Sequence, residues 1–361
     1  MCTILTIAVF LAGCSPMQEE SNKTNNRYIK GVWISYSEMD QLLEGDFKLE
    51  FIKVVQNCKN RGITDLFVHM VPFCDAYYMS DVFPLRITVA KYDFDVLEYM
   101  ITECHKNEID FHAWINPYRV KTKDNDISTL DSNSPVKTVL NEKDVSFTGG
   151  IYLNPASVRA RELILDGIRE LINKYNVDGI HFDDYFYPTT DPSFDSESYS
   201  DYSSATAKPI GLDEWRRANV NALISGVYTA IKFKDKNIIF SISPSADVEQ
   251  NYSQKYADVA AWVRSDCIDY IIPQLYFGFE YPVEKYRFNN LLNEWQKITD
   301  GKNAKLIIGL AAYKINTQNE PDKQEWSNGK TIIAQQTKIC EENEKISGHI
   351  YFSYSFVCEH L

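Results

Sequence analysis

Short apolar runs alternate with amphipathic stretches along most of the chain. Eight runs rich in β-branched and aromatic residues lie at 29–36, 63–71, 110–118, 177–185, 237–244, 268–277, 305–313 and 349–355. Between them, apolar residues recur at spacings of three and four, which predicts helices near 47–60, 94–107, 156–174, 212–233, 254–265, 284–297 and 328–344. Strands and helices that alternate in this way predict repeated β-α units around a parallel sheet.

The number of these units predicts the fold class. Eight strands with seven intervening helices favour an α/β fold of the (β/α)8 TIM-barrel type. Two doubly wound domains are the alternative, although no linker-like composition interrupts the series. Only residues 356–361 follow the last predicted strand, so we expect the eighth helix to be truncated.

The start of the chain forms a separate apolar segment that ends at Cys14. It reads MCTILTIAVFLAGC and is too short to span a bilayer as a stable helix. It resembles a bacterial lipoprotein signal, whose lipobox cysteine becomes the lipidated first residue after cleavage. No Lys or Arg precedes Cys14, although such signals carry a positive first region. An apolar tip of a soluble protein is the alternative.

A polar segment separates this signal from the first predicted strand. Residues 15–27 read SPMQEESNKTNNR and show no apolar periodicity, which predicts a flexible tether. The chain is thus divided into a signal peptide at 1–14, a tether at 15–27 and a barrel at 28–361. We expect a protein of the cell envelope, lipid-anchored through Cys14 on the extracytoplasmic face of a bacterial membrane.

Composition and charge exclude two classes of protein. With 44% hydrophobic residues the chain has enough apolar material for a large core and is not a disordered segment. A net charge of -13 provides no broad basic surface, which argues against nucleic-acid binding. The chain also has 23 Tyr, 19 Phe and 6 Trp residues. Tyr and Trp combine an apolar face with a polar edge, which suits sugar rings as well as interfaces.

Cysteine spacing gives no support to a zinc site. Besides Cys2 and Cys14 of the signal, six cysteines are scattered without a C-x-x-C pair. An exported protein permits disulfides, but their connectivity is not readable from the sequence, and we expect most of these residues to be small buried side chains. Sequence patterns of a phosphate-binding loop, a serine-esterase elbow and a zinc-protease helix are absent as well.

In a TIM barrel the reacting groups lie at the carboxyl ends of the strands. Residues 177–185 of the fourth predicted strand read VDGIHFDDY. Alternation places His181 and Asp183 opposite Ile180 and Phe182, so we expect His181 and Asp183 to point into the barrel mouth. Adjacent acids without a neighbouring base indicate catalysis, charge relay or metal binding. The alternative is that these acids cap a loop or pair with an arginine.

Glycoside hydrolysis needs two carboxyl groups across the scissile bond. Asp183 is the predicted nucleophile or base. Its partner is open: Asp184, Asp247, Glu280 and Asp75 all follow predicted strands, and each of them could equally be an ordinary loop acid. Such chemistry requires no cofactor.

A metal-dependent reaction is a second possibility. His112, His181 and Asp183 together would fit a polysaccharide deacetylase-like hydrolase. The loop at 186–207 contains four acids and no Lys or Arg, which suits a solvated surface loop or a weak calcium site.

Nine ordered segments resemble the glycosyl-hydrolase-like 10 family, formerly domain of unknown function 187, and cover nearly all of the chain after the tether. They are Gly31-Val32-Trp33, 71–78 (VPFCDAYY), 112–119 (HAWINPYR), Leu153-Asn154-Pro155, 178–188 (DGIHFDDYFYP), Trp215-Arg216-Arg217, Ile242-Ser243-Pro244, 273–276 (PQLY) and 309–314 (GLAAYK). The resemblance implies a barrel of the glycosidase type. The family includes a divisome-localised enzyme that cleaves peptidoglycan glycan strands lacking stem peptides.

The resemblance also implies roles for single residues. Asp183 matches the acid of the family motif H-F-D-D-Y, and Asn116, Tyr118 and Arg119 match its N-P-Y-R motif. After I-S-P this chain has Ser245-Ala246-Asp247 where many members have an aromatic residue, which suggests a different subsite preference.

We therefore expect a hydrolase of β-linked glycans, with peptidoglycan favoured because a lipid-tethered barrel would face it. Sugar rings are expected to stack on Trp33, Trp114, Tyr118 and Tyr276. Arg119, Asn116 and Gln274 are expected to bind sugar hydroxyls or a lactyl carboxylate. Further candidates for substrate binding are Asp75, His112, His181, Tyr185 and Tyr313. The alternative from another class is a non-catalytic carbohydrate-binding lipoprotein.

Overall fold

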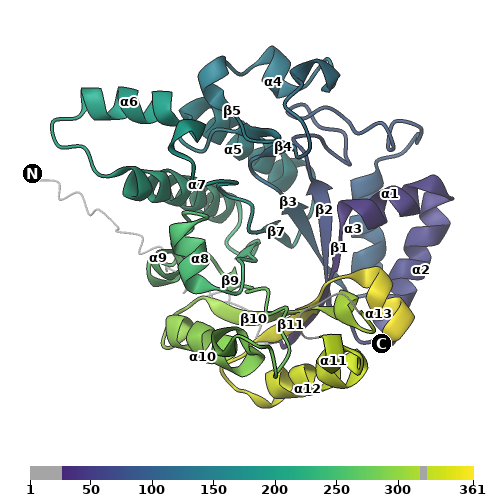
Figure 1. Cartoon of the computed structure of the whole chain (residues 1–361). Helices are drawn as coiled ribbons and strands as arrows, with labels where there is room; N and C mark the ends of the chain where they lie inside the picture. Colours follow the sequence, from purple (N-terminus) through teal and green to yellow (C-terminus); the bar gives the residue numbers. More distant parts are fainter. Residues whose placement is uncertain (1–26, 318–322) are drawn as a thin grey trace, which may run out of the picture.

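The computed structural model describes residues 27–317 and 323–361, and the predicted signal, Cys14 and most of the tether lie outside them. Eight parallel strands form a closed barrel in the order β1-β2-β3-β7-β8-β9-β10-β11 (Figure 1). Their bounds are β1 Ile29–Ile34, β2 Asp65–Val71, β3 Asp110–Ile115, β7 Gly179–Phe182, β8 Ile239–Ile242, β9 Tyr270–Ile271, β10 Lys305–Leu310 and β11 Gly348–Tyr351. The predicted (β/α)8 fold and all eight predicted strands are confirmed.

The seven predicted helices are also present. They are α2 Phe47–Asn60, α3 Val96–Lys106, α5 Val158–Lys174, α7 Leu212–Lys234, α9 Val259–Arg264, α10 Phe288–Thr299 and α12 Gly329–Glu342. Aspartate or serine caps several of them: Asp46, Asp95 and Ser157 accept backbone N–H bonds at the first turns of α2, α3 and α5. A helix of seven residues, α13 Tyr354–His360, follows β11, so the eighth helix is present in a short form.

Several short elements were not predicted. They are the helices α1 Tyr36–Glu44, α4 Pro135–Thr138, α6 Ser196–Ala205, α8 Val248–Ser253 and α11 Lys323–Trp326, and the 3-10 turns η1 Ile127–Thr129, η2 Glu142–Asp144, η3 Pro192–Phe194, η4 Glu284–Tyr286 and η5 Ala312–Lys314. Most of them lie in the loops that follow the carboxyl ends of the strands. The predicted strands extend too far at their carboxyl ends, because the residues there no longer form the hydrogen bonds of the sheet. Pro273, for example, has no N–H with which to extend β9.

A small antiparallel sheet follows β3. It has the order β4-β6-β5, with β4 Arg119–Lys121, β5 Val145–Phe147 and β6 Ile151–Leu153. Figure 1 shows β4 and β5 beside α4, beyond the end of β3. Each of these strands has three residues, which is too short for an alternating pattern to be recognised. This sheet adds a layer to the carboxyl-end face of the barrel.

Polar residues close the amino-terminal end of the barrel. The Arg27 guanidinium donates to Asp65 at 2.9 Å and to Asp110 at 2.6 Å, and both acids begin their strands. His112 Nε2 lies 3.1 Å from Asp65 Oδ1. His112 therefore faces the end of the barrel opposite the mouth, and the expectation that it binds substrate is wrong.

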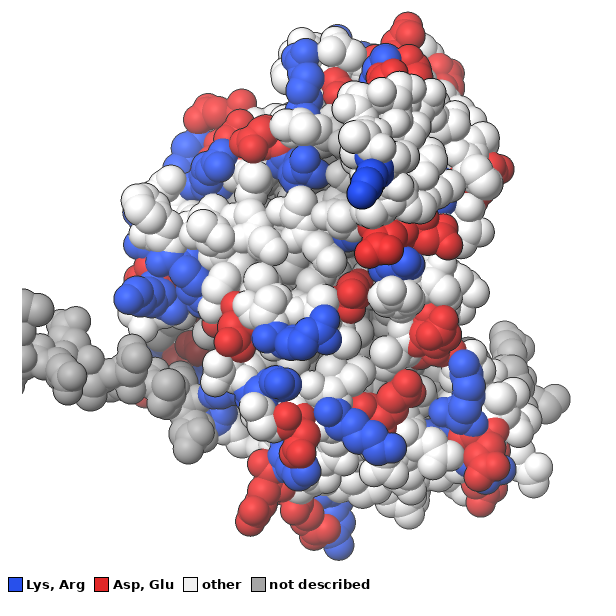
Figure 2. Space-filling model, turned by 90° about the vertical axis from the view of Figure 1, so that its left-hand side faces the viewer, with Lys and Arg blue, Asp and Glu red and all other residues white. Residues whose placement is uncertain are grey.

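Within residues 27–317 and 323–361, no helix combines the length and the apolar character needed to cross a membrane. The six cysteines of these segments are free thiols, and four of them are buried, as expected for small core side chains. Lys, Arg, Asp and Glu side chains are interspersed on the face shown in Figure 2. That face shows no broad basic area of the kind that a nucleic-acid backbone would require.

Candidate active site

Asp183 lies at the centre of the candidate site, directly after β7, and only 2% of it is exposed. The Trp114 indole N–H donates to its Oδ2 at 3.0 Å. Asn116 Nδ2 donates to Oδ2 at 3.1 Å and to Oδ1 at 3.2 Å. Because β3 pairs with β7, with Trp114 opposite His181, the strand register itself brings these groups together. The predicted acid and two of its predicted neighbours thus form one hydrogen-bonded unit.

The environment of Asp183 suits proton transfer. Its pKa is raised from the ordinary 3.8 to about 7, mainly by burial; the nearby Asp184 carboxylate acts in the same direction, whereas Arg119 and the Trp114 hydrogen bond act to lower it. Near neutral pH both protonation states are accessible, which is the condition for a general acid or base. A nucleophilic carboxylate needs to be ionised, so this pKa favours the proton-transfer role over the nucleophile that was also considered.

Asn116 has its amide oriented by the backbone. Its Oδ1 accepts the backbone N–H of Arg119 at 3.1 Å, which leaves Nδ2 to face Asp183. Its own backbone N–H donates to the Val71 carbonyl at 2.9 Å. The first contact follows from the tight turn between β3 and β4, and the second from the pairing of β3 with β2. An amide is needed here because one end must accept and the other must donate.

The same turn buries Tyr118, which has no exposed surface. Its carbonyl accepts the backbone N–H of Leu153 at 2.8 Å, and its ring packs in the core beneath the small sheet. The expectation that Tyr118 stacks on a sugar is therefore wrong. The strands of the sheet that covers it have only three residues each, which is too short to be predicted from the sequence.

His69 supports Trp114 and was not predicted as a site residue. The two rings are stacked with centroids 3.8 Å apart and planes 8° apart. His69 is 1% exposed, and burial together with the charges of Arg119 and Arg86 holds its pKa well below the usual range, so it is neutral. Neither of its ring nitrogens has a hydrogen-bond partner among the described residues. Its position two residues after Phe67 on β2 is the signal that could have identified it as inward-facing.

Trp33 and His181 fill the interior of the barrel. The Trp33 indole N–H donates to His181 Nε2 at 3.0 Å, and His181 Nδ1 lies 2.9 Å from Ser241 Oγ. Since an indole only donates, Nε2 accepts, and burial keeps the histidine pKa well below its usual range, so the proton is on Nδ1. Trp33 is 2% and His181 0% exposed. Both point inward as expected, but at a depth where they pack against protein, and the expectation of direct sugar contact is wrong for both.

Arg119 and Tyr185 form one side of the mouth. The guanidinium of Arg119 lies over the ring of Tyr185 at 4.1 Å and over that of Phe73 at 4.9 Å. Arg119 is half-buried, and Tyr185 is 44% exposed. The backbone N–H of Tyr185 also approaches Asp183 Oδ1 at 3.5 Å. Phe73 was not among the predicted site residues.

An aromatic cluster forms the other side. Tyr276 meets the edge of Tyr313 at 5.7 Å and stacks with Phe352 at 6.0 Å, and all three rings are half-buried. They follow β9, β10 and β11, which lie across the closed barrel from β2, β3 and β7. Gln274 begins this side, where its Nε2 donates to the Ser243 carbonyl at 2.9 Å. Two aromatic groups thus flank the position of Asp183.

The candidates for the second carboxylate are in different surroundings. Asp184 is half-buried next to Asp183 and accepts a hydrogen bond from Ser245 Oγ at 2.7 Å. Glu280 is exposed in the loop after β9. Asp75 is ion-paired with Arg86 at 2.7 Å, although burial raises its pKa. Asp184 is the candidate that adjoins the central acid.

Asp247 has a structural role. Its Oδ1 caps α8 by accepting the backbone N–H groups of Glu249 and Gln250 at 3.1 and 3.2 Å. Its Oδ2 accepts from the Tyr286 hydroxyl at 2.8 Å and pairs with Lys285 at 2.6 Å. Although burial acts to raise its pKa, these partners hold it below the usual range. The prediction of a catalytic Asp247 is wrong, because both oxygens are already engaged.

Basic residues from other segments neutralise the acidic loop after β7. Lys143 pairs with Glu197 at 2.8 Å and with Asp201 at 2.7 Å, and the buried Arg216 pairs with Asp195. Among the described residues no group of three or more His, Cys, Asp or Glu side chains is placed to hold a metal ion. His112 in particular faces the opposite end of the barrel from Asp183.

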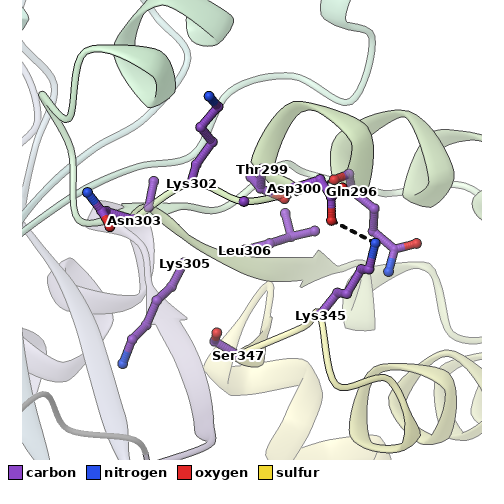
Figure 3. A pocket seen from close by; sticks show the side chains of 11 residues that line it. Gln296, Thr299, Asp300, Lys302, Asn303, Lys305, Leu306, Lys345 and Ser347 are labelled. Atoms are coloured by element: carbon purple, nitrogen blue, oxygen red, sulfur yellow. Dashed lines mark hydrogen bonds and ion pairs between the residues drawn. The ribbon is translucent and has the colours of Figure 1, made fainter.

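A hollow of about 210 Å³ lies at the start of β10 (Figure 3). Asp300 and Lys345 form an ion pair of 2.7 Å in its wall. It opens at the amino-terminal side of the strands, where barrels carry stabilising rather than reacting residues. The hollow is therefore separate from the site at Asp183.

Known proteins resemble the chain in both sequence and structure. The family model for glycosyl hydrolase-like 10 matches residues 28–328. The chain is 30% identical to the glycosyl hydrolase YngK of Bacillus subtilis (strain 168), over 92% of this chain and 69% of that protein. It is 30% identical to the glycosyl hydrolase DigH of Escherichia coli (strain K12), over 85% of this chain and 75% of that protein.

Two solved structures show the same fold. The PgaB (BpsB) glycoside hydrolase domain from Bordetella bronchiseptica has a TM-score of 0.62 at 12% identity, over 92% of this chain and 96% of that one. Alpha-L-fucosidase isoenzyme 2 from Paenibacillus thiaminolyticus has a TM-score of 0.60 at 10% identity, over 92% of this chain and 48% of that one. At such low identity the likeness concerns the barrel alone.

Proposed function

We propose, from the premise that the chain belongs to the glycosyl hydrolase-like 10 family and is a glycoside hydrolase, that it cleaves peptidoglycan glycan strands with Asp183 as the proton-transferring residue. One observation carries the role of Asp183. It is a buried carboxyl group at the barrel mouth with a pKa of about 7, held by Trp114 and Asn116. A group of this kind can give a proton to the leaving oxygen and recover it afterwards.

In the proposed reaction the proton of Asp183 moves to the glycosidic oxygen as the bond from that oxygen to the anomeric carbon breaks. The oxygen of a water molecule then bonds to the anomeric carbon, and the proton that this water loses goes to a carboxylate. Asp184, which adjoins Asp183 and is oriented by Ser245, is the second carboxylate in this proposal. The flanking aromatic groups, Tyr185 on one side and Tyr276 with Tyr313 on the other, would hold the sugar rings.

The choice of peptidoglycan rests on the start of the sequence and on the family. A lipoprotein signal that ends at Cys14 would anchor the protein in the cell envelope, where this polymer is the surrounding glycan. Fatty-acid labelling tests the anchor. Label should enter the native protein and be lost in Cys14→Ala; a variant that remains labelled would overturn the lipid anchor.

Glycan strands freed of stem peptides are the substrate for the test of function. The purified full chain should release soluble saccharides that mass spectrometry detects. Asp183→Asn should lower the rate by about 10²–10⁴-fold, the usual contribution of a general acid or base. Asp191→Asn changes an exposed acid of the same loop and should leave the rate unchanged. Binding without release by the native protein would overturn the proposal and favour the carbohydrate-binding alternative for this polymer.

A further inference from the structure

Arg119 is a cation at the mouth that has no carboxylate partner among the described residues. Its guanidinium pairs with no carboxylate among the residues that the structure describes, and its buried Nε has no hydrogen-bond partner there. Its charge nevertheless reaches Asp183, whose pKa it lowers. The ring contacts with Phe73 and Tyr185 hold it beside the acid. A fixed arginine without a counter-ion next to a catalytic group is a candidate for ligand recognition.

A second cation lies close by. Lys255 Nζ is 5.8 Å from the centroid of the Tyr185 ring, over which Arg119 also lies. Lys255 is half-buried, and like Arg119 it pairs with no described carboxylate. The other arginine near this side of the mouth is different, because Arg86 is held by both Asp75 and Asp40. Two unpaired cations thus face one exposed tyrosine ring.

The surroundings select the kind of anion. Ring contacts occupy the flat surface of the Arg119 guanidinium, and the guanidinium also interacts with the Tyr185 side chain, so the remaining N–H groups in its plane are the donors left for a ligand. A planar carboxylate fits these donors with two parallel hydrogen bonds. Asp183 and Asp184 lie beside the site, and their charge disfavours a doubly charged phosphate group more than a singly charged carboxylate.

We propose that Arg119, assisted by Lys255, forms a subsite for a carboxylate borne by a sugar next to the scissile bond. This inference rests on the proposed glycan hydrolysis and specifies its substrate as an acidic glycan. Two chemical sources supply such a group: a lactyl ether on an amino sugar, as in peptidoglycan, or a uronic acid. The subsite would make Arg119 a determinant of specificity, whereas Asp183 performs the proton transfer.

The test compares glycan strands that keep their carboxylates with strands in which carbodiimide and borohydride have reduced them to alcohols. Assays at pH 5.5 keep Asp183 protonated in every variant, because its pKa is about 7. The native protein should lose at least tenfold in kcat/KM on the reduced strands. Arg119→Gln should show equal kcat/KM on both substrates, at the level of the native protein on reduced strands. Arg119→Lys should recover part of the preference, because a point charge replaces a planar fork.

Arg169→Gln is the matched control. It removes the same charge from the exposed outer surface of α5, where Arg169 pairs with Asp166, and it should keep the full preference. Native protein that cleaves both kinds of strand equally well would overturn the carboxylate subsite and leave peptidoglycan cleavage standing. In another outcome, the protein cleaves uronic acid oligosaccharides with the same dependence on Arg119 but does not cleave peptidoglycan. That result would support the carboxylate subsite and overturn peptidoglycan as the substrate.

Discussion

Two arginines of this barrel lie over pairs of aromatic rings, and they differ in one respect. Arg216 lies over Tyr187 at 5.2 Å and Tyr256 at 5.0 Å, much as Arg119 lies over its two rings. Arg216 is completely buried, and its Nε donates to Asp195 Oδ2 at 3.0 Å. Arg119 is half-buried and has no such carboxylate among the described residues.

The contrast separates structure from function. The Arg216 pair joins α7 to the loop after β7, and it also holds two carbonyls of that loop, those of Thr190 and Asp191. Every strong donor of this arginine serves the fold. Arg119 donates to no carboxylate or carbonyl among the described residues, although its guanidinium also lies over two rings. An arginine that is positioned but has no carboxylate partner is available to a ligand, so the same arrangement of guanidinium and rings has different uses on α7 and on β4.

Removing the partner of Arg216 should have the largest effect on stability. Asp195→Ala leaves a buried guanidinium without its counter-ion, and we expect a loss of about 3–5 kcal/mol in the free energy of unfolding. Urea denaturation measures this change. Arg119→Gln in the same assay should change stability by less than about 1 kcal/mol, since it breaks no ion pair among described residues. Comparable losses in the two variants would remove the contrast.

Replacing Asp183 should raise stability, whereas replacing Asp195 lowers it. The reason is that burial makes the ionised form of Asp183 unfavourable in the folded protein. The pKa of Asp183 is about 7 in the folded protein against an ordinary 3.8. Between these values the native state holds a proton that the unfolded state has released, so stability falls as pH rises from about 4 to 7. Asp183→Asn lacks this dependence and should exceed the native protein by about 2–4 kcal/mol at pH 8, and by far less at pH 4.

Urea denaturation across that pH range measures the difference between the two proteins. The control is Asp191→Asn, at an exposed acid whose pKa is lowered by its bonds to Ser193 and which should show no gain with pH. A constant difference between native protein and Asp183→Asn would contradict the raised pKa.

The hydrogen bonds of Asp183 should be visible in the pH profile. If its protonated form gives the proton, kcat/KM falls as pH rises through about 7. Trp114→Phe removes a donor that lowers this pKa, so the alkaline limb should move upward by about one unit or less. Trp33→Phe removes an indole N–H that donates to His181 instead of Asp183, so the alkaline limb of its pH profile should stay at the native position. Equal shifts in both variants would point to a general packing effect.

The smallest effect is expected at Tyr118, next to Arg119 in sequence but directed into the core. Its hydroxyl has no partner among the described residues, so Tyr118→Phe leaves no group unpaired. We expect stability within about 0.5 kcal/mol of the native protein and an unchanged KM for glycan strands. Thermal melts and steady-state kinetics provide the two values. A large rise in KM would restore Tyr118 as a substrate contact.

Much of this arrangement was predictable, because alternation of strands and helices identifies the barrel and its carboxyl-end loops. Asp183 and Trp114 were predicted from their places at strand ends, and Asn116 was also singled out by its match to a family motif. Alternation predicts that a side chain points into the barrel, but not how far along the barrel axis it lies. His112 and Trp114 both point into the barrel, but they are two residues apart, or about 6.6 Å along the strand, and only Trp114 reaches the acid.

Other features depend on contacts that are distant in sequence. Asp247 follows a strand as a catalytic acid would, but Lys285 and Tyr286 engage it as a helix cap. Tyr118 is covered by strands that are too short to recognise. Arg216 and Arg119 both stand in family motifs, and only the fold shows which of them has found its carboxylate.

The contact of Arg27 with Asp65 and Asp110 sets a direction for the whole molecule. It fixes Arg27, the first described residue, at the amino-terminal end of the strands, whereas Asp183 lies at their carboxyl-terminal end. Any attachment through the segment before Arg27 would therefore hold the barrel by its base. The mouth would face away from the surface of attachment, and a polymer would be engaged from the far side, without having to pass between enzyme and support.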